Sequence, residues 1–328
     1  MGSIRKFSKS VSIYKIAFSA IFLFLFTPVC FSQNLPQGGT VVEGANPLDY
    51  TSQPNTLNVN VNSDKAIINW DSFNVGSGYT VNFNRDSSFI ALNRVTGANP
   101  SEIFGNINAQ NGQVFIVNPN GIIFGSGSHV NAAGLVASTL QISDEDFKNP
   151  TFNNATKAYE YKFYKGSKNA SIVNKGIIST TKPGGYICLL SQAIDNQGFA
   201  IADLGTVVLA AGEEITTGLD NKSLISVVIS KEVQSTIYDA SGNRMDSAIK
   251  NSGTIQANGG KIILTADVLN NVFDYAINNS NVIQANTLDE HDGVIELKAS
   301  GAPIINSGTI SASATIDINA SANVTNTG

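Results

Sequence analysis

Segments of alternating apolar and polar residues recur through the second half of the chain. One pattern, Gly-x-(Ile/Val)-x-Leu, appears as "GYICL" (185–189), "GTVVL" (205–209), "GKIIL" (260–264) and "GVIEL" (293–297). Alternation with a period of two is typical of a β-strand that buries one face. We therefore expect a series of short strands whose Ile, Val and Leu side chains point inward.

A second pattern, Ile-x-Asn-x-Gly-x-Ile, occurs between these strands. It is clearest in "IVNKGII" (172–178), "IKNSGTI" (249–255) and "IINSGTI" (304–310), and three weaker copies accompany it. The Asn positions are separated by 22, 55, 28, 27 and 20 residues, and 55 is close to two units with an insertion. The copies place their Asn residues at Asn174, Asn196, Asn251, Asn279, Asn306 and Asn326.

Units of 20 to 28 residues without heptads or helix caps have the length of one coil of a parallel β-helix. Stacked coils lie about 4.8 Å apart, so the recurrent Asn side chains are predicted to form a hydrogen-bonded ladder at one corner. The Asn is also expected to tolerate left-handed backbone angles, and the following Gly to ease a sharp bend. A β-sandwich would explain the alternation but not the recurrent Asn-x-Gly.

The first half follows the same pattern less regularly. Residues 104–118, "FGNINAQNGQVFIVN", are interpreted as early coils, and the Pro- and Gly-punctuated residues 34–60 as a cap that protects the open end. Trp70 and Phe73 are expected to pack the cap onto the first coils. Two segments that break the pattern, 147–170 and 221–248, are predicted to be hairpins or strands outside the helix.

The amino terminus has the features of a secretory signal peptide over residues 1–32. Four cations flank or precede the uncharged apolar run from Ile16 to Phe26, which is shorter than the roughly 20 residues that a transmembrane helix needs. Small residues favour cleavage between Ser32 and Gln33. A lipoprotein signal at Cys30 fits poorly, because Val29 occupies a position that requires a small residue.

Removal of the signal peptide changes the composition in two ways. The net charge of -5 becomes -5 - 4 = -9, which argues against nucleic acid as a partner. Cys188 becomes the one remaining cysteine, so an intramolecular disulfide is excluded in the predicted oxidising compartment. Cys188 should occupy an outward or corner position of its strand as an inert thiol.

Candidate chemistry is sparse along the chain. The acids of the repeats fall at mixed phases, whereas β-helical polysaccharide lyases and hydrolases need carboxylates clustered on one face. His129 and His291 lack metal-ligand spacing, and the cluster Asp144 to Asp146 is interpreted as a solvated turn. We therefore expect no catalytic site, no metal and no cofactor, with a β-helical polysaccharide-degrading enzyme as the alternative.

The segment "VNPNGIIFGS" (117–126) places four turn-forming residues between two apolar runs. Asn118, Pro119, Asn120 and Gly121 suit a type I turn. Two interpretations stay open at this point. The turn is either a structural corner or a motif that a partner recognises.

Ordered blocks around this turn resemble the amino-terminal secretion domain of two-partner-secretion exoproteins, the filamentous haemagglutinin and haemolysin family. The blocks are "NWDSFNVG" (69–76), "NRVTGANPSEIFGNI" (93–107), "GQVFIVNPNGIIFG" (112–125), "GLVASTLQISDEDF" (134–147) and "GTVVLAAG" (205–212). Residues 118–121 match the family's Asn-Pro-Asn-Gly secretion motif. The second family motif, Asn-Pro-Asn-Leu, is absent from "VNVNSDKAIIN" before Trp70.

The resemblance implies a right-handed parallel β-helix and a route of export. The chain would cross the inner membrane through the Sec translocon, be recognised in the periplasm by a dedicated outer-membrane transporter barrel, and fold at the cell surface. Residues 33–170 would form the capped secretion domain and residues 171–328 continuing coils of a longer or truncated exoprotein. Host-surface glycans or proteins are the partners expected downstream, and an autotransporter passenger or toxin region is the second alternative.

Overall fold

The computed structural model of the chain describes residue 2 and residues 34–220, 223–239 and 241–328. Residues Gln33–Gly328 form one compact unit. The predicted signal peptide lies outside the described residues. The division predicted at residue 170 stays a prediction.

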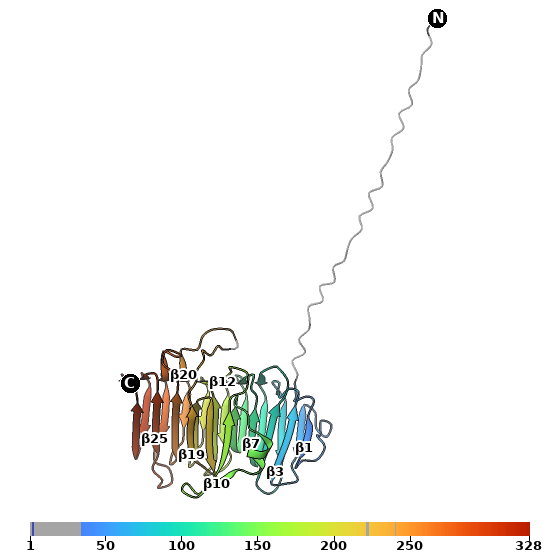
Figure 1. Cartoon of the computed structure of the whole chain (residues 1–328). Coiled ribbons are helices and arrows are strands. Elements are labelled where there is room, and N and C mark those ends of the chain that lie inside the picture. Colours follow the sequence, from blue (N-terminus) through green and yellow to red (C-terminus); the bar gives the residue numbers. More distant parts are fainter. Residues whose placement is uncertain (1, 3–33, 221–222, 240) are drawn as a thin grey trace. The chain divides into compact units, whose positions relative to one another are not determined.

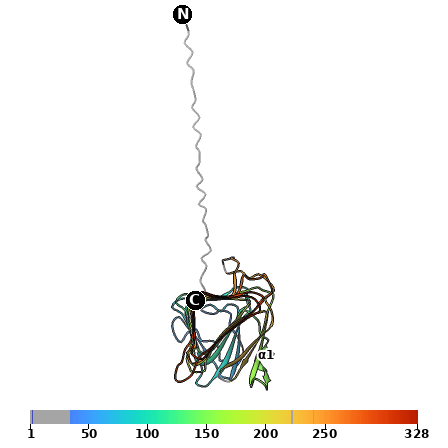
Figure 2. The ribbon, with the colours of Figure 1, turned by 90° about the vertical axis from the view of Figure 1, so that its left-hand side faces the viewer.

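This unit is a parallel β-helix whose coils have three faces (Figure 1). A 17-stranded sheet contributes two faces and an 8-stranded sheet the third. Figure 2 shows the coils along their stacking direction, with the short helix α1 beside them. Fold class and coil stacking are thus as the repeats predicted.

Each face is a column of parallel strands in register. The first face contains β2 (Thr56–Asn60), β4 (Thr80–Asn84), the first parts of β7 (Asn106–Val117) and β9 (His129–Ser138), β13 (Ile177–Thr180), β16 (Phe199–Ile201), β21 (Thr254–Gln256), β24 (Val282–Ala285) and β27 (Thr309–Ala312). The second contains β3 (Lys65–Trp70), β5 (Phe89–Val95), the later parts of β7 and β9, β14 (Tyr186–Ser191), β17 (Thr206–Ala211), β22 (Lys261–Asp267), β25 (Val294–Ser300) and β28 (Thr315–Ala320). The third contains β6 (Ser101–Ile103), β8 (Ile122–Phe124), β12 (Ser171–Asn174), β15 (Ala193–Asn196), β20 (Ser247–Asn251), β23 (Tyr275–Asn279), β26 (Ile304–Asn306) and β29 (Val324–Asn326).

The cap is shorter than the sequence suggested. Strand β1 (Thr40–Glu43) pairs antiparallel with β3, but residues 56–60 already form β2 of the first coil. In β2, Leu57 and Val59 are buried while Asn58 and Asn60 face outward, which is the alternation of a coil strand. Trp70 and Phe73 are fully buried and make an edge-to-face contact, with their ring centroids 5.6 Å apart. The Trp70 ring lies against Gly39 of the cap.

Two excursions leave the second face and build a separate antiparallel sheet. The first carries α1 (Asp144–Lys148), β10 (Thr151–Asn153) and β11 (Ala158–Tyr164), and the second carries β18 (Glu214–Leu219) and β19 (Leu224–Lys231). Their strand order is β10-β11-β18-β19. The second excursion begins before the predicted residue 221, because β18 pairs with β11 instead of continuing the coil.

This sheet covers a second apolar core on the outside of the β-helix. The outward row of the second face runs through Ile67, Leu92, Phe115, Val136, Cys188, Val208 and Ile263, all buried, and then changes to Glu296 and Asp317. In this row the outward residue is therefore apolar where the excursions cover it and acidic beyond them. Burial raises the pKa of the Cys188 thiol, which keeps it protonated.

Candidate functional site

The candidate site is the corner Asn118 to Gly121, which joins β7 on the second face to β8 on the third. The Gly121 backbone N–H donates to the Asn118 carbonyl at 3.2 Å and closes the turn. Gly121 has φ +121°, a conformation that a side chain would strain. Asn118 and Gly121 are buried, whereas Pro119 and Asn120 are partly exposed.

The Asn118 side chain has all its hydrogen bonds inside the protein. Its Nδ2 donates to the Asn99 carbonyl and to Ser101 Oγ, each at 3.0 Å. Its Oδ1 accepts the backbone N–H and the Nδ2 of Asn120, again at 3.0 Å. Since Asn118 is 0% exposed, a partner of the folded domain cannot contact this side chain.

The corner holds three successive coils together. Asn120 Nδ2 donates to the Gly97 carbonyl of the preceding coil at 2.9 Å. The Asn118 backbone N–H donates to the Ser138 carbonyl, where the first excursion begins. Gly97 in turn lies so close to the Asp71 carbonyl that a Cβ at residue 97 would be 2.0 Å from that oxygen. Gly97 belongs to the block 93–107, but no pattern in the sequence indicates this close approach.

Two cations on the early coils fix the first excursion. Lys65 Nζ donates to the carbonyls of Phe147 and Lys148, each at 2.8 Å, at the carboxyl end of α1. Arg94 contacts Asp144 at 2.7 Å and the Ile142 carbonyl at 2.9 Å. Burial lowers the pKa of Lys65, against the opposing influence of Glu43.

The acidic cluster is a helix start and not the solvated turn that the sequence suggested. The Ser143 side chain accepts the Asp146 backbone N–H at 2.9 Å as the N-cap of α1. Acidic residues in the first turn also stabilise a helix through its dipole. The exposed His129 and His291 lie at the start of β9 and in a turn.

The structure brings the repeated Asn residues into one row, which is buried from Asn174 to Asn306 and exposed at Asn326. Each Nδ2 donates to the next Oδ1: Asn174 to Asn196 at 2.8 Å, Asn196 to Asn251 and Asn251 to Asn279 at 2.7 Å, Asn279 to Asn306 at 2.6 Å, and Asn306 to Asn326 at 2.7 Å. In the earlier coils the same row holds Phe124, Ile103 and Val75.

The expected left-handed backbone at these Asn residues was wrong. The positive-φ residues of the described chain do not include them or the glycines that follow them. Those glycines are needed for a different reason, the close approach of coils. A Cβ at Gly253 would lie 2.1 Å from the Gly198 carbonyl oxygen, and one at Gly198 would lie 2.2 Å from that of Gly176.

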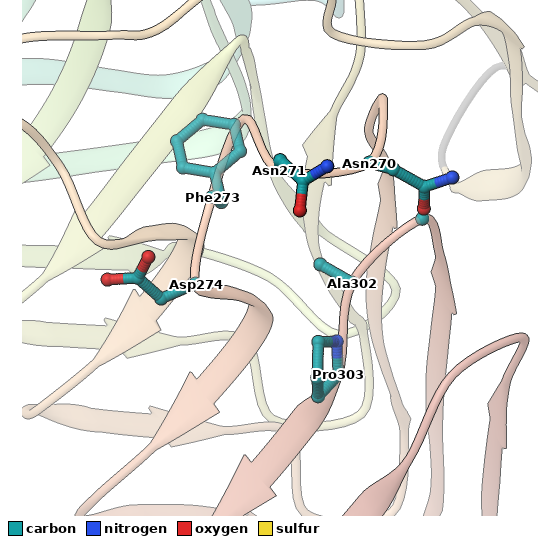
Figure 3. Close-up of a pocket in the computed structure, with 7 residues that line it drawn as sticks. Asn270, Asn271, Phe273, Asp274, Ala302 and Pro303 are labelled. Carbon is teal, nitrogen blue, oxygen red and sulfur yellow. The ribbon is translucent and has the colours of Figure 1, made fainter.

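One hollow on the described surface, beside β23 and β26, offers little for catalysis. The hollow in Figure 3 has a volume of about 710 Å³ and is lined by residues 270, 271, 273, 274 and 301–303. Its one carboxylate, Asp274, forms an ion pair with Arg244 at 3.1 Å. Glycoside hydrolysis usually requires two carboxylates, and these lining residues supply one.

Within the described residues, no helix is long and apolar enough to cross a membrane. Within residues 34–220, 223–239 and 241–328, no group of three or more His, Cys, Asp or Glu side chains is arranged to hold a metal ion.

Comparison with known proteins agrees with this architecture. The family model of the TPS secretion domain, the domain of two-partner secretion, matches residues 32–312. The chain belongs to this family and is the secretion domain of a two-partner exoprotein. TPS exoproteins are secreted via the periplasm.

Individual relatives come from Haemophilus influenzae. The chain is 32% identical over 305 residues to a heme/hemopexin-binding protein, a match that covers 90% of this chain and 31% of that protein. It is thus similar to about a third of that relative's length. The HMW1 secretion domain superposes with a TM-score of 0.66 and 29% identity, covering 84% of this chain and 66% of that structure.

Proposed function

We propose that the early coils of this domain fold in the periplasm, where a dedicated outer-membrane transporter recognises them, and that they start β-helix folding of the later coils, which follows at the cell surface. Entry into the periplasm through the Sec translocon is part of the proposal and rests on the predicted signal peptide. The main support is the Asn118 corner, which joins three coils through buried hydrogen bonds. Each coil of a solenoid contacts its neighbours, so a corner that fixes three early coils can serve as a template for the coils that follow.

The corner also suggests which residues a transporter could contact in the folded domain. Asn118 is buried, so its role in export is to hold the corner together. Pro119 and Asn120 are partly exposed and are the accessible members of the motif. We propose that recognition uses this accessible part, together with neighbouring surface on the third face.

Export and folding can be separated by substitution. Each variant is produced with its cognate transporter, exported protein is measured in the medium, and thermal unfolding is measured on the purified domain. We expect Asn118→Ala to lower both export and stability, because several buried groups lose their partners. We expect Pro119→Ala to lower export while the unfolding temperature changes little.

The exposed Asn131→Ala, on the first face, serves as the matched control and should retain both properties. If Pro119→Ala and Asn131→Ala are exported equally well, the motif is only a structural corner. If export of the unchanged chain does not depend on the transporter, the proposed function is wrong.

A separate proposal concerns the exported protein. The relatives are named for heme/hemopexin binding, which supports the same activity for the exoprotein that carries this domain. An adhesin-like role toward host glycans or proteins is the alternative, and it rests on the family resemblance. Titration of the exported protein with heme, followed by absorbance, and with immobilised hemopexin tests the first activity. Absence of binding to both would leave adhesion as the proposed role.

A further inference from the structure

The outward side of the first face is a strip without a charged side chain, here called the neutral strip. Two residues of each of its nine strands point outward, and strand pairing aligns them in two rows across successive coils. One row is Thr56, Thr80, Asn106, His129, Ile177, Phe199, Thr254, Val282 and Thr309, and the other is Asn58, Asn82, Asn108, Asn131, Ser179, Ile201, Gln256, Gln284 and Ser311. None of these eighteen residues is Asp, Glu, Lys or Arg.

The absence of charge distinguishes this face from the other two. With 14% charged residues in the chain, two or three would be expected among eighteen positions (18 × 0.14), and more at a surface, where charged residues concentrate. The outward rows of the other faces include Lys65, Arg94, Glu296 and Asp317 on the second and Glu102, Asp195 and Lys250 on the third. Asp203 borders the neutral strip, where it accepts a hydrogen bond from Gln256 Nε2 at 2.9 Å. A charged partner such as nucleic acid, an acidic glycan or an anionic membrane would therefore meet no row of opposite charge on this face.

The dimensions of the neutral strip limit the partner further. Parallel strands lie about 4.8 Å apart, so nine strands span roughly 38 Å, while the two outward rows lie only about 7 Å apart. A strip this narrow offers less than the roughly 800 Å² per partner that a stable protein interface buries, which argues against a second copy of the chain. Its inner strands are paired on both sides, so they offer no free edge to an added peptide strand. These dimensions favour a linear polymer that lies along the stacking direction.

The side chains of the neutral strip match an uncharged glycan. Phe199 is 47% exposed, between Ile177 of the preceding coil and Thr254 of the next, and an exposed ring can pack on the C–H face of a pyranose. Amides lie on both sides of it along the strip. Among the described residues, no hydrogen-bond partner is present for the Nδ2 of Asn131, two coils earlier, or for the Oε1 of Gln284, two coils later. These atoms can donate to and accept from sugar hydroxyls.

We propose that the neutral strip binds an extended, uncharged, β-linked glycan along the stacking direction, with one sugar packed on Phe199 and its neighbours hydrogen-bonded to the amides. An extended β-linked pyranose chain advances per sugar by a distance close to the spacing of the coils. Successive sugars would therefore meet equivalent rows of side chains. The inference goes beyond export and rests on the adhesin-like alternative, because it names the surface and the chemical class of the glycan.

Calorimetry with the Gln33–Gly328 unit tests the inference. The probes are three neutral β-1,4-linked hexasaccharides, built of glucose, N-acetylglucosamine or xylose. A hyaluronan hexasaccharide, which is β-linked but acidic, and maltohexaose, which is neutral but α-linked, are the comparison ligands. We expect at least one of the three neutral β-linked probes to bind, and both comparison ligands to bind at least tenfold more weakly.

Substitutions locate the bound glycan. Phe199→Ala should weaken binding about tenfold with little change in the unfolding temperature, because the ring is exposed. Asn131→Ala and Gln284→Ala should each weaken binding at least twofold, since they lie on opposite sides of Phe199 along the strip. Tyr159→Ala removes an aromatic side chain of similar exposure, 43%, from the separate antiparallel sheet, and this matched control should bind normally.

The outcomes separate this inference from the proposed function. No binding of any neutral β-linked probe, equal binding of the hyaluronan hexasaccharide, or normal binding by Phe199→Ala would overturn the inference. Normal binding by both amide variants would overturn it as well, because the glycan would not lie along the strip. Transporter-dependent export of the same variants should be unchanged, so these failures leave the proposed function intact. Adhesion of the exported protein to host cells without binding of any probe would place the adhesin-like role on another surface.

Discussion

The early coils, residues 56–138, and the late coils, residues 171–326, use different interactions to hold the same fold. Where the late coils stack Asn on Asn, the early coils place Val75, Ile103 and Phe124 in the same row. The early coils are also fixed by individual contacts, such as Lys65 to α1 and Asn118 to Ser101. The comparison shows that the buried corner row is a repeated amide contact in the late coils, whereas in the early coils it is apolar and is supplemented by contacts that occur once.

This difference suggests a division of labour during folding. Unique contacts select one register, because a shifted coil would leave Asn118 or Arg94 without its partner. A repeated ladder gives weaker selection of register but lets every coil use its predecessor as a template. The boundary between the two kinds of row falls between Phe124 and Asn174, on either side of the first excursion.

The largest expected effect follows from removing a large side chain from the apolar part of the corner row, which contains Val75, Ile103 and Phe124. Phe124→Ala should lower the free energy of unfolding by about 3–5 kcal/mol, because it leaves a cavity at a fully buried aromatic position. Guanidinium denaturation of the Gln33–Gly328 unit measures the change. Phe199→Ala, at a side chain 47% exposed, is the control and should cost far less. Equal losses would mean that the corner row does not hold the early coils together.

A smaller loss is expected from interrupting the ladder. Asn251→Ala leaves the Nδ2 of Asn196 and the Oδ1 of Asn279 without their partners, and each such group costs about 1–3 kcal/mol. We expect a loss on the order of 2–4 kcal/mol in the same denaturation experiment. Asn326→Ala, at the exposed end of the ladder, should change stability much less. A negligible effect of Asn251→Ala would show that the ladder contributes register and not stability.

Acid should weaken the link between the two excursions. Glu213 contacts Lys165 at 2.6 Å and Lys231 at 3.4 Å. Burial acts to raise the pKa of Glu213, but hydrogen bonds from Lys165, the Gln234 backbone and Lys231 outweigh it, so the pKa lies below its usual 4.5.

The sign of the pH dependence follows from that lowered pKa. The carboxylate stabilises the fold above about pH 4.5, and this contribution is lost as the pH falls through the lower folded value. Unfolding temperatures between pH 7 and pH 3 should therefore fall less steeply for Glu213→Gln, which starts from a lower stability at pH 7. Parallel curves for the variant and the unchanged protein would assign the acid sensitivity to other groups.

The smallest effect is expected on the exposed Asn row of the first face. Asn108 donates to Asn82 at 3.0 Å, and Asn82 donates to Asn58 at 3.2 Å, but this row lies at the surface. Asn108→Ala should change the free energy of unfolding by no more than about 0.5 kcal/mol. A loss as large as that of Asn251→Ala would mean that exposed and buried amide rows are equivalent.

The sequence predicted most where contacts repeat. The spacing of Asn174, Asn196 and Asn251 was enough to place them in one row, because a repeated unit must bury the same positions each time. The sequence pattern also indicated that the recurrent glycines are structurally required. The requirement comes from the close approach of neighbouring coils and not from backbone angles.

The early coils and the excursions were harder to predict for the same physical reason. Lys65 reaches α1 across 82 residues, and Asn93 accepts the Trp70 indole N–H inside the core at 3.1 Å. Each of these contacts occurs once, so no repeated pattern along the chain predicts it. The start of the second excursion was missed because the alternation in β18 is the same whether the strand lies in a coil or outside it.

The buried Asn row has a consequence for how such chains change over evolutionary time. Each Asn of the ladder presents the same amide to the next coil, and each glycine allows the same close approach of that coil. After duplication or deletion of a coil, the neighbouring coils would therefore still form the same hydrogen bonds and packing contacts. The late coils can therefore vary in number by recombination at little structural cost. The early coils cannot, since no other coil could replace the partners of Asn118.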